Sequence, residues 1–410
     1  MESTAPVGEA RRVLALSSLG HFINDGTVFF VPVIAALLSP VRGFSPLDVT
    51  VLFAVYYITS AILGLWVGWW ADRRGRPAYL MAVGIGLLGA GLFLFYVVLA
   101  GWAGPVEYPV ALLAGGVTGL AASFYHPLGA SLIQRAFHPE QHGVAMGING
   151  ALGSIGRASY PVLFFLITLA VVTSDAILLF AGIGVLAAFV IAYGLHSLIV
   201  AERNASPSAD TRAGRSVTGG IIRLTGVSFV RSVASQGVAV WIPTYLTAVR
   251  GVPATGSLGL AVAVMYVGGI VGQPFFGLLA DRFDRRMLIG IASAGSALTT
   301  LGYLVTAGVP ADALLFMMGF FMFSAFPLLM TLSAEYVPSG SSSLANAAVF
   351  GLGSGGGGTV GPLIVGAIAA GGYAMLTTGF EAMAILGIVS AFLVLVLPAP
   401  RRRRRGLLFG

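Results

Sequence analysis

The sequence predicts an all-α integral membrane protein whose twelve transmembrane helices form two pseudo-symmetric six-helix bundles. Three observations predict this fold. The 410 residues are 57% hydrophobic and only 9% charged, with a mean hydropathy of +0.93, which is far from the composition of a soluble domain. Charged or Pro/Gly-rich breaks divide the chain into apolar segments long enough to cross a bilayer core about 30 Å thick. A loop motif also recurs, with Asp72 and Asp281 at matching positions.

The expected spans follow one another with short connections. We expect the first span to remain in the membrane rather than to be removed as a signal peptide. Arg11 and Arg12 lead directly into a full-length apolar segment that no small-residue cleavage site follows. The predicted spans are 13–38, 47–70, 78–101, 108–136, 142–172, 176–200, 219–249, 255–279, 286–308, 312–337, 342–370 and 373–398.

The arginines set the orientation of these spans. The net charge of +7 could suit a nucleic-acid binder, but the arginines lie at helix ends, and Arg42 and Arg250 are the two that fall on the poorer side. By the positive-inside rule the rich side is cytoplasmic, so we expect a multi-pass protein of the inner (plasma) membrane with both termini in the cytoplasm. The tail "RRRRRGLLFG" then anchors the topology and contacts anionic lipid. The rich side holds Arg11, Arg12, Arg73, Arg74, Arg76, Arg135, Arg203, Arg212, Arg215, Arg223, Arg282, Arg285, Arg286 and Arg401 to Arg405.

Two loops of one pattern divide the chain into related halves. "GWWADRRGRP" follows the second span and "GLLADRFDRR" follows the eighth, and Pro32 and Pro243 lie at nearly the same depth in the first and seventh spans. We therefore expect an N-terminal bundle over 1–201, a polar cytoplasmic linker over 202–218, a C-terminal bundle over 219–400 and a basic tail over 401–410.

These motifs resemble the major facilitator superfamily over all twelve spans. "GWWADRRGRP" is close to that superfamily's loop signature, with Pro77 in place of a basic residue, and the second copy has Asp284 where a Gly is usual. The resemblance implies two halves that rock about a substrate site at the midplane of the membrane. It also implies that the loop residues act as a gate, namely Asp72, Arg73, Arg76, Asp281 and Arg282.

A narrower resemblance is to the fosmidomycin-resistance branch of drug exporters. It rests on "GHFINDG", "SFYHPLGASLI", "FVRSVASQGVAVWIPTYL" and "SAEYVPSGSSSLANAAVFGLGSGGGGTVGP", in order and position. Two departures are Tyr125 in place of a phenylalanine and Leu128 in place of a frequent acidic residue. The resemblance implies an export role.

Three charges are predicted at the middle of the bilayer. Asp25 lies about twelve residues into its span, so at 1.5 Å per residue it is roughly 18 Å deep, and Arg157 and Arg231 lie at similar depths. Such groups are costly without a wet cavity or a partner, which favours a functional role. The alternative is a buried Asp–Arg ion pair that only holds helices together.

Neighbouring polar residues complete the candidate site. His21 shares the helix face of Asp25 four residues earlier, so the two form a titratable pair that we assign to proton coupling. Each arginine offers a fork of donors for a carboxylate or phosphonate. We assign to substrate binding Arg157, Arg231, Asn24, Asn149, Gln236, Tyr125 and His126.

The sequence favours a secondary transporter over other classes. A proton-driven antiporter that exports a small amphiphilic anion is the first hypothesis, and an uptake symporter on the same scaffold is the alternative. An enzyme is disfavoured because there is no Cys, no Lys and no His-Glu-x-x-His motif, and a channel because paired repeats fit rocking halves. We expect protons and a small anionic molecule as partners, a monomer, and no nucleic acid, cofactor or metal.

Overall fold

The computed structural model describes residues 7–74, 77–137, 142–198, 219–280, 282–336 and 347–399, and these residues form helices and no strand. The long helices are α1 (Val7–Arg42), α2 (Pro46–Arg74), α3 (Pro77–Leu99), α4 (Glu107–Ala136), α5 (His142–Thr168), α6 (Thr173–Gly194), α8 (Gly219–Ala248), α9 (Gly256–Ala280), α10 (Arg285–Val305), α11 (Val309–Glu335), α13 (Gly356–Ala369) and α14 (Leu376–Leu393). Short helices are η1 (Gly104–Val106), η3 (Ala347–Gly355), η4 (Tyr373–Met375) and η5 (Val394–Val396).

The all-helical membrane fold predicted from the sequence is confirmed. Ten helical segments in the described part of the chain are long and apolar enough to cross a membrane. The long helices α2 and α8 accompany them, and Arg223 and Arg231 lower the hydropathy of α8. The glycine-rich stretch before Pro362 forms the π-helix η3 and the start of α13, where Gly357 and Gly361 lie against backbone carbonyls of α8. Clustered glycines therefore allow α13 to approach α8 closely.

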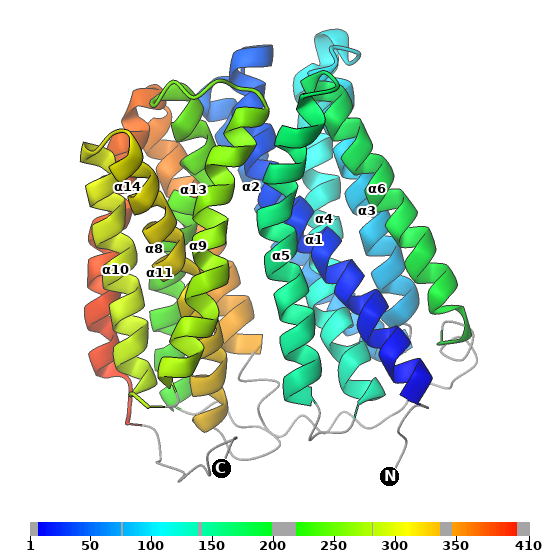
Figure 1. Ribbon diagram of the computed structural model, residues 1–410, viewed down its shortest axis with the longest axis vertical. Coiled ribbons are helices and arrows are strands. Elements are labelled where there is room, and N and C mark those ends of the chain that lie inside the picture. Colours follow the sequence, from blue (N-terminus) through cyan, green and yellow to red (C-terminus); the bar gives the residue numbers. More distant parts are fainter. Residues whose placement is uncertain are drawn as a thin grey trace.

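The helices form two groups that lie side by side. Figure 1 shows α1, α3, α4, α5 and α6 in one group and α8, α9, α10, α11 and α14 in the other, with α5 and α9 facing each other between them. Helix α1 begins and η5 ends at the same end of the molecule, which we call the terminal face. The predicted linker at 202–218 and tail at 401–410 lie outside the described residues.

Arg42 and Arg250, the two arginines on the poorer side, have equivalent structural roles in the two groups. Arg42 is the last residue of α1 and donates to the carbonyl oxygen of Leu99, the last residue of α3. Arg250 follows α8 and donates to the carbonyl oxygens of Tyr303 and Thr306, at the end of α10. A helix C-terminus has unpaired carbonyls and a negative dipole end, so each guanidinium caps it. This repeated contact explains why two arginines depart from the charge asymmetry.

The departure from the loop signature at Asp284 also has a structural reason. Asp284 is the N-cap of α10, and its carboxylate accepts hydrogen bonds from the Arg286 backbone N–H (2.9 Å) and guanidinium (2.6 Å). The hydrogen bond from the Arg286 side chain holds the pKa of the Asp284 carboxyl below its usual value. Beside it, Arg285 forms an ion pair with Glu335 near the end of α11.

The two groups contact each other mainly at the end away from the terminal face, which we call the opposite face. Helix α5 ends there and α9 begins there, and a Cβ atom on Gly259 would meet the carbonyl oxygen of Pro161. Helices α2 and α13 also meet there, where Gly366 lies against Thr50. Gly259 thus allows backbones of different halves to touch, and Gly366 leaves room for the Thr50 side chain. A side chain in place of either glycine must push the two helices apart.

We predict that Gly259→Leu spreads the two groups at the opposite face. The chain has no cysteine, so Thr50→Cys and Gly366→Cys form a unique pair whose oxidation to a disulfide reports contact between α2 and α13. The yield of this disulfide should fall in the Gly259→Leu background. Gly182→Leu is the matched control, because no atom lies within 4 Å of a Cβ on Gly182. Equal disulfide yields in the Gly259→Leu and Gly182→Leu backgrounds would show that Gly259 is not needed for contact between α2 and α13 at the opposite face.

Candidate functional site

The Asp25 carboxylate lies where three helices of the first group meet. It is 6% exposed, and its Oδ2 is 3.4 Å from His21 Nε2 on the same helix and 3.5 Å from Arg157 Nε on α5. Its Oδ1 is 3.4 Å from His126 Nε2 on α4 and accepts a hydrogen bond from Asn24 at 3.1 Å. The residues predicted to surround Asp25 therefore converge on it, and the buried charge has several partners.

A chain of hydrogen bonds fixes which nitrogen of His21 carries a proton. Tyr125 donates its hydroxyl proton to the Ser17 carbonyl (2.8 Å), so the hydroxyl oxygen accepts from Asn149 Nδ2 (2.8 Å). The other end of this amide, Asn149 Oδ1, then faces His21 Nδ1 at 2.9 Å, and the Asn149 carbonyl oxygen lies 2.8 Å from the same nitrogen. Both atoms are acceptors, so Nδ1 of His21 is the donor.

This tautomer leaves one proton to be shared between His21 and Asp25. With Nδ1 protonated, a neutral His21 presents the lone pair of Nε2 to the carboxylate 3.4 Å away. Two electron-rich atoms at this distance repel, so a proton belongs either on Nε2, as an imidazolium, or on the Asp25 carboxyl. The geometry therefore allows the two side chains to share a single proton.

Small residues let α5 bring its functional face to α1. Asn149, Gly153 and Arg157 follow one another at four-residue spacing, which places them on one face of α5, and all three face α1. A Cβ atom on Gly153 would overlap the His21 ring. Glycine at this position therefore allows the imidazole to lie flat against α5 and to stack on Tyr125, with 4.7 Å between ring centroids.

Arg157 also borders a cavity between the two groups of helices. Its Nη2 donates to Ser154 Oγ at 3.0 Å, and its guanidinium lies over the rings of Phe29 (5.1 Å) and Phe323 (5.9 Å). The cavity is lined by α5, α9 and α11, and includes Tyr266 and Gln273. The arginine is 20% exposed on its side chain, so it contacts Asp25 with one edge and retains accessible donors.

The sequence did not identify the residues of the second group at this cavity. Phe323, Tyr266 and Gln273 belong to ordinary apolar helices, and nothing in their spacing marks them as parts of a site. One signal was present for Ser154, which precedes Arg157 by three residues and so shares its helix face.

Arg231 lies apart from the other predicted residues. We expected it to share one site with Asp25 and Arg157, but it lines a different cavity, enclosed by α8, α10 and α14 of the second group. Its Nη2 donates to the Met322 carbonyl on α11. Gln236 is half-buried on α8, beside Gly358 of α13. Depth in the membrane alone could not show which side of α8 faces the other half.

The predicted gate is mostly outside the described part of the molecule. The side chains of Asp72 and Arg73, and residues Arg76 and Asp281, lie outside the described residues. Arg282 is described and exposed just beyond α9.

The ligand atoms of His21, Asp25 and His126 lie within 4.8 Å of one another, as in a metal site. However, Arg157 places a positive charge 3.5 Å from Asp25, which opposes a divalent cation at the same carboxylate. The arrangement suits proton exchange and anion binding.

Comparison with known proteins identifies relatives over nearly the whole chain. The Major Facilitator Superfamily family model matches residues 15–348 and 224–408. The fosmidomycin resistance protein of Escherichia coli (strain K12) is 24% identical over 384 residues, which cover 90% of this chain and 88% of that protein. An uncharacterised MFS-type transporter of Bacillus subtilis (strain 168), YfnC, is 24% identical over 404 residues, covering 96% and 94%.

Solved structures share the fold at lower identity. A bacterial homologue of the human lysosomal transporter Spinster, inward-facing and unoccupied, has a TM-score of 0.73 at 16% identity and covers 96% of this chain and 98% of its own. The xylose transporter XylE from E. coli, in an inward-open conformation, has a TM-score of 0.74 at 14% identity, with coverage of 96% and 98%.

We predict that Asp25 and Arg157 are energetically coupled. Removing one charge leaves the other poorly compensated, so Asp25→Asn and Arg157→Gln should each destabilise the protein, and the double variant should lose less than their sum. A coupling free energy of about 0.5–3 kcal/mol is expected from unfolding in detergent. Asp25→Asn combined with Arg231→Gln serves as the control and should be additive, because Arg231 lies in another cavity. Additivity in both pairs would argue against the ion pair.

Proposed function

Because the chain belongs to the major facilitator superfamily, and is thus a membrane transporter rather than an enzyme, we propose that it is a proton-driven antiporter that exports a small amphiphilic anion. The observation that carries this proposal is the buried Asp25 carboxylate, which contacts His21, His126 and Arg157 from three helices. Superfamily carriers move substrate by rocking two halves about a midplane site. A titratable cluster at that site can couple protonation to the rocking.

Asp25 and His21 are the proposed proton carriers. The hydrogen-bonded Nδ1 of His21 stays protonated, so a single proton exchanges between Nε2 and the carboxyl. His126 is 43% exposed on its side chain and lies 3.4 Å from the same carboxylate, which makes it the route between the pair and the surrounding water. Asp25 lies on α1, so its protonation changes the contacts of α1 with α4 and α5.

Arg157 is the proposed anion ligand. Its guanidinium offers a planar fork of donors that suits a carboxylate or phosphonate. Tyr266 and Gln273 add polar groups from the second half, while Phe29 and Phe323 offer aromatic faces for the apolar part of an amphiphilic substrate. Ligands supplied by both halves allow binding to draw the halves together.

The direction of transport is supported by a relative, and the contacts between the halves indicate which face is closed. The relative in E. coli is named for resistance to fosmidomycin, which agrees with export. With the termini in the cytoplasm, the contacts of Gly259 and Gly366 close the external side, so this conformation receives substrate from the cytoplasm. Asp72 is proposed to close the cytoplasmic side in the alternate conformation, since an acidic residue there can bind a helix N-terminus.

Uptake symport is a second candidate, and one observation favours it. Arg157 contacts Asp25, so protonation of Asp25 frees the guanidinium for an anion. Proton and anion would then promote each other's binding, as symport requires. In antiport, binding of the proton must weaken binding of the anion, and binding of the anion must weaken binding of the proton.

The two candidates are distinguished in proteoliposomes loaded with fosmidomycin and an internal pH indicator, with no initial pH gradient. Efflux should acidify the lumen in antiport and make it alkaline in symport.

We predict that Asp25→Asn abolishes transport of fosmidomycin driven by a pH gradient and leaves exchange at equal pH measurable. The amide keeps the shape of the carboxyl and cannot exchange a proton at this position. Gradient-driven uptake and equal-pH exchange in proteoliposomes measure the two activities separately. Asp175→Asn, at the exposed start of α6, is the matched control and should retain both. Gradient-driven transport at the wild-type rate in Asp25→Asn would assign coupling to another group.

We also predict that anions stabilise the protein more than cations of matched size, and that Arg157→Gln removes this preference. Arg157→Lys should restore it partly, because an ammonium keeps the charge and loses the fork. Melting temperatures with carboxylates, phosphonates and quaternary ammonium ions measure the preference. Arg231→Gln is the control and should keep it. If the tightest-binding ligand is a lipophilic cation, and its stabilising effect is unchanged in Arg157→Gln, the result would contradict anion transport.

A further inference from the structure

Arg231 is a buried cation that the proposed transport site does not use. Its side chain is 7% exposed on α8, and no described carboxylate forms an ion pair with it. The described acidic residues of the second half are engaged or exposed elsewhere: Asp284 and Glu335 pair with Arg286 and Arg285, and Asp312 and Glu381 are exposed. The guanidinium therefore has a carbonyl partner, Met322, and no counter-charge in this part of the chain.

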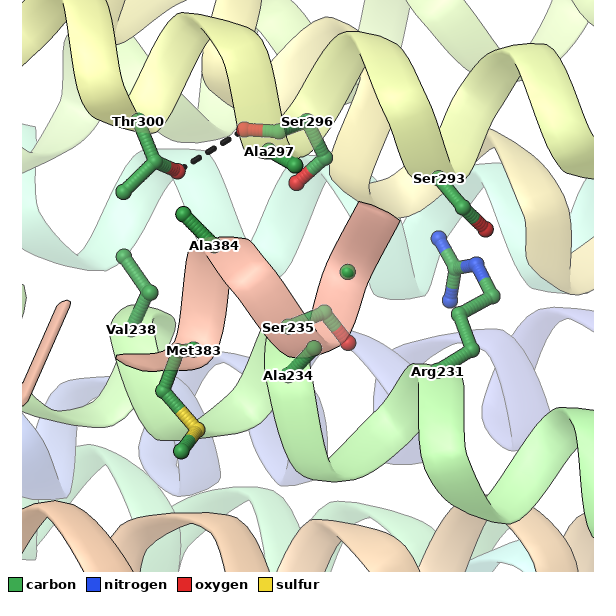
Figure 2. A pocket seen from close by; sticks show the side chains of 11 residues that line it. Arg231, Ala234, Ser235, Val238, Ser293, Ser296, Ala297, Thr300, Met383 and Ala384 are labelled. Carbon is green, nitrogen blue, oxygen red and sulfur yellow. Dashed lines mark hydrogen bonds between the residues drawn. The ribbon is translucent and has the colours of Figure 1, made fainter. Parts of the chain in front are cut away.

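The cavity at Arg231 is lined with further donors. Figure 2 shows the guanidinium directed at the hydroxyl of Ser293 on α10, with Ser235 and Ser296 along the same cavity. The Nε atom of Arg231 and Oγ of Ser293 are buried without a hydrogen-bond partner. Ser293 is 3% exposed. A buried N–H and a buried hydroxyl that point into one cavity are costly unless something there accepts from them.

The size and composition of the cavity restrict what it can accept. Its free volume for the centres of water-sized spheres is about 10 Å³, which is room for one small particle. Ala234, Ala297 and Ala384 form the apolar part of the wall. A carboxylate or phosphate with its substituents is too large for this space, whereas a monatomic anion of halide size needs only slight adjustment of the wall.

We propose that Arg231 and Ser293 bind a single halide ion, chloride in ordinary media, between α8, α10 and α14. The ion accepts from Nε of Arg231 and Oγ of Ser293 and supplies the missing counter-charge. It would hold α8 and α10 of the second half together without contacting the Asp25 site. A single water molecule in the cavity could accept hydrogen bonds from Arg231 and Ser293, but it is neutral and would leave the charge of the guanidinium uncompensated. A halide is therefore favoured over water.

The test is the melting temperature of the purified protein in chloride against gluconate, at constant ionic strength and constant sodium. A ligand that binds only the folded state raises the melting temperature with a saturating dependence on its concentration. Chloride and bromide should do so, while gluconate and sulfate, which do not fit the cavity, should not. Equal stabilisation by all four anions would overturn the proposal, because it would indicate an ionic-strength effect.

Three variants test whether the halide-dependent rise in melting temperature arises at this cavity. Arg231→Gln should lose the halide response, and Arg157→Gln should retain it, which separates this site from the anion transport site. Ser293→Ala removes one donor and should raise the half-saturating chloride concentration about tenfold. If Arg231→Gln does not fold, the Ser293→Ala titration still decides. A halide response that is unchanged in Ser293→Ala and in any folded Arg231 variant would overturn the site.

Discussion

The structure depends on one constraint: a carboxylate buried in the middle of a membrane protein must be surrounded by partners. Asp25 meets this constraint with groups from α1, α4 and α5. This constraint also affects residues that do not contact the carboxylate, because each partner of Asp25 must itself be positioned by hydrogen bonds. His21 is held by Asn149, Asn149 by Tyr125, and Tyr125 by the backbone of α1. A continuous polar network therefore replaces apolar packing at the centre of the first half.

The two halves have the same architecture and different interiors. Arginine caps on equivalent helices and glycine contacts are repeated structural devices. The polar groups are unequally distributed, since the Asp25 network belongs to the first half while Arg231 lies in its own cavity in the second. The proposed proton exchange thus involves one half. The other half contributes Tyr266, Gln273 and Phe323 across the interface, so the proposed substrate binding would depend on how the halves are oriented.

Sequence patterns predicted the fold because bilayer thickness, charge asymmetry and the repeated loop each act over a whole span. They also predicted the face shared by His21 and Asp25, since helical spacing fixes which side chains lie together. They were wrong to group Arg231 with Asp25. Depth along a helix follows from counting residues, but rotation about its axis is set by packing against neighbouring helices, which the sequence of one helix does not show. The partners Gln273 and Phe323 were missed for the same reason.

The most direct test of proton coupling through Asp25 is to count the protons exchanged when a transported anion binds. Detergent-solubilised protein in weakly buffered solution, with a pH indicator, is mixed with the anion, and the protons released per molecule are measured. Coupling through Asp25 predicts a change in bound protons in the wild type, a release for antiport or an uptake for symport, and no change in Asp25→Asn at the same fractional saturation. An equal change in bound protons in the two proteins would contradict it, because another group would then carry the proton.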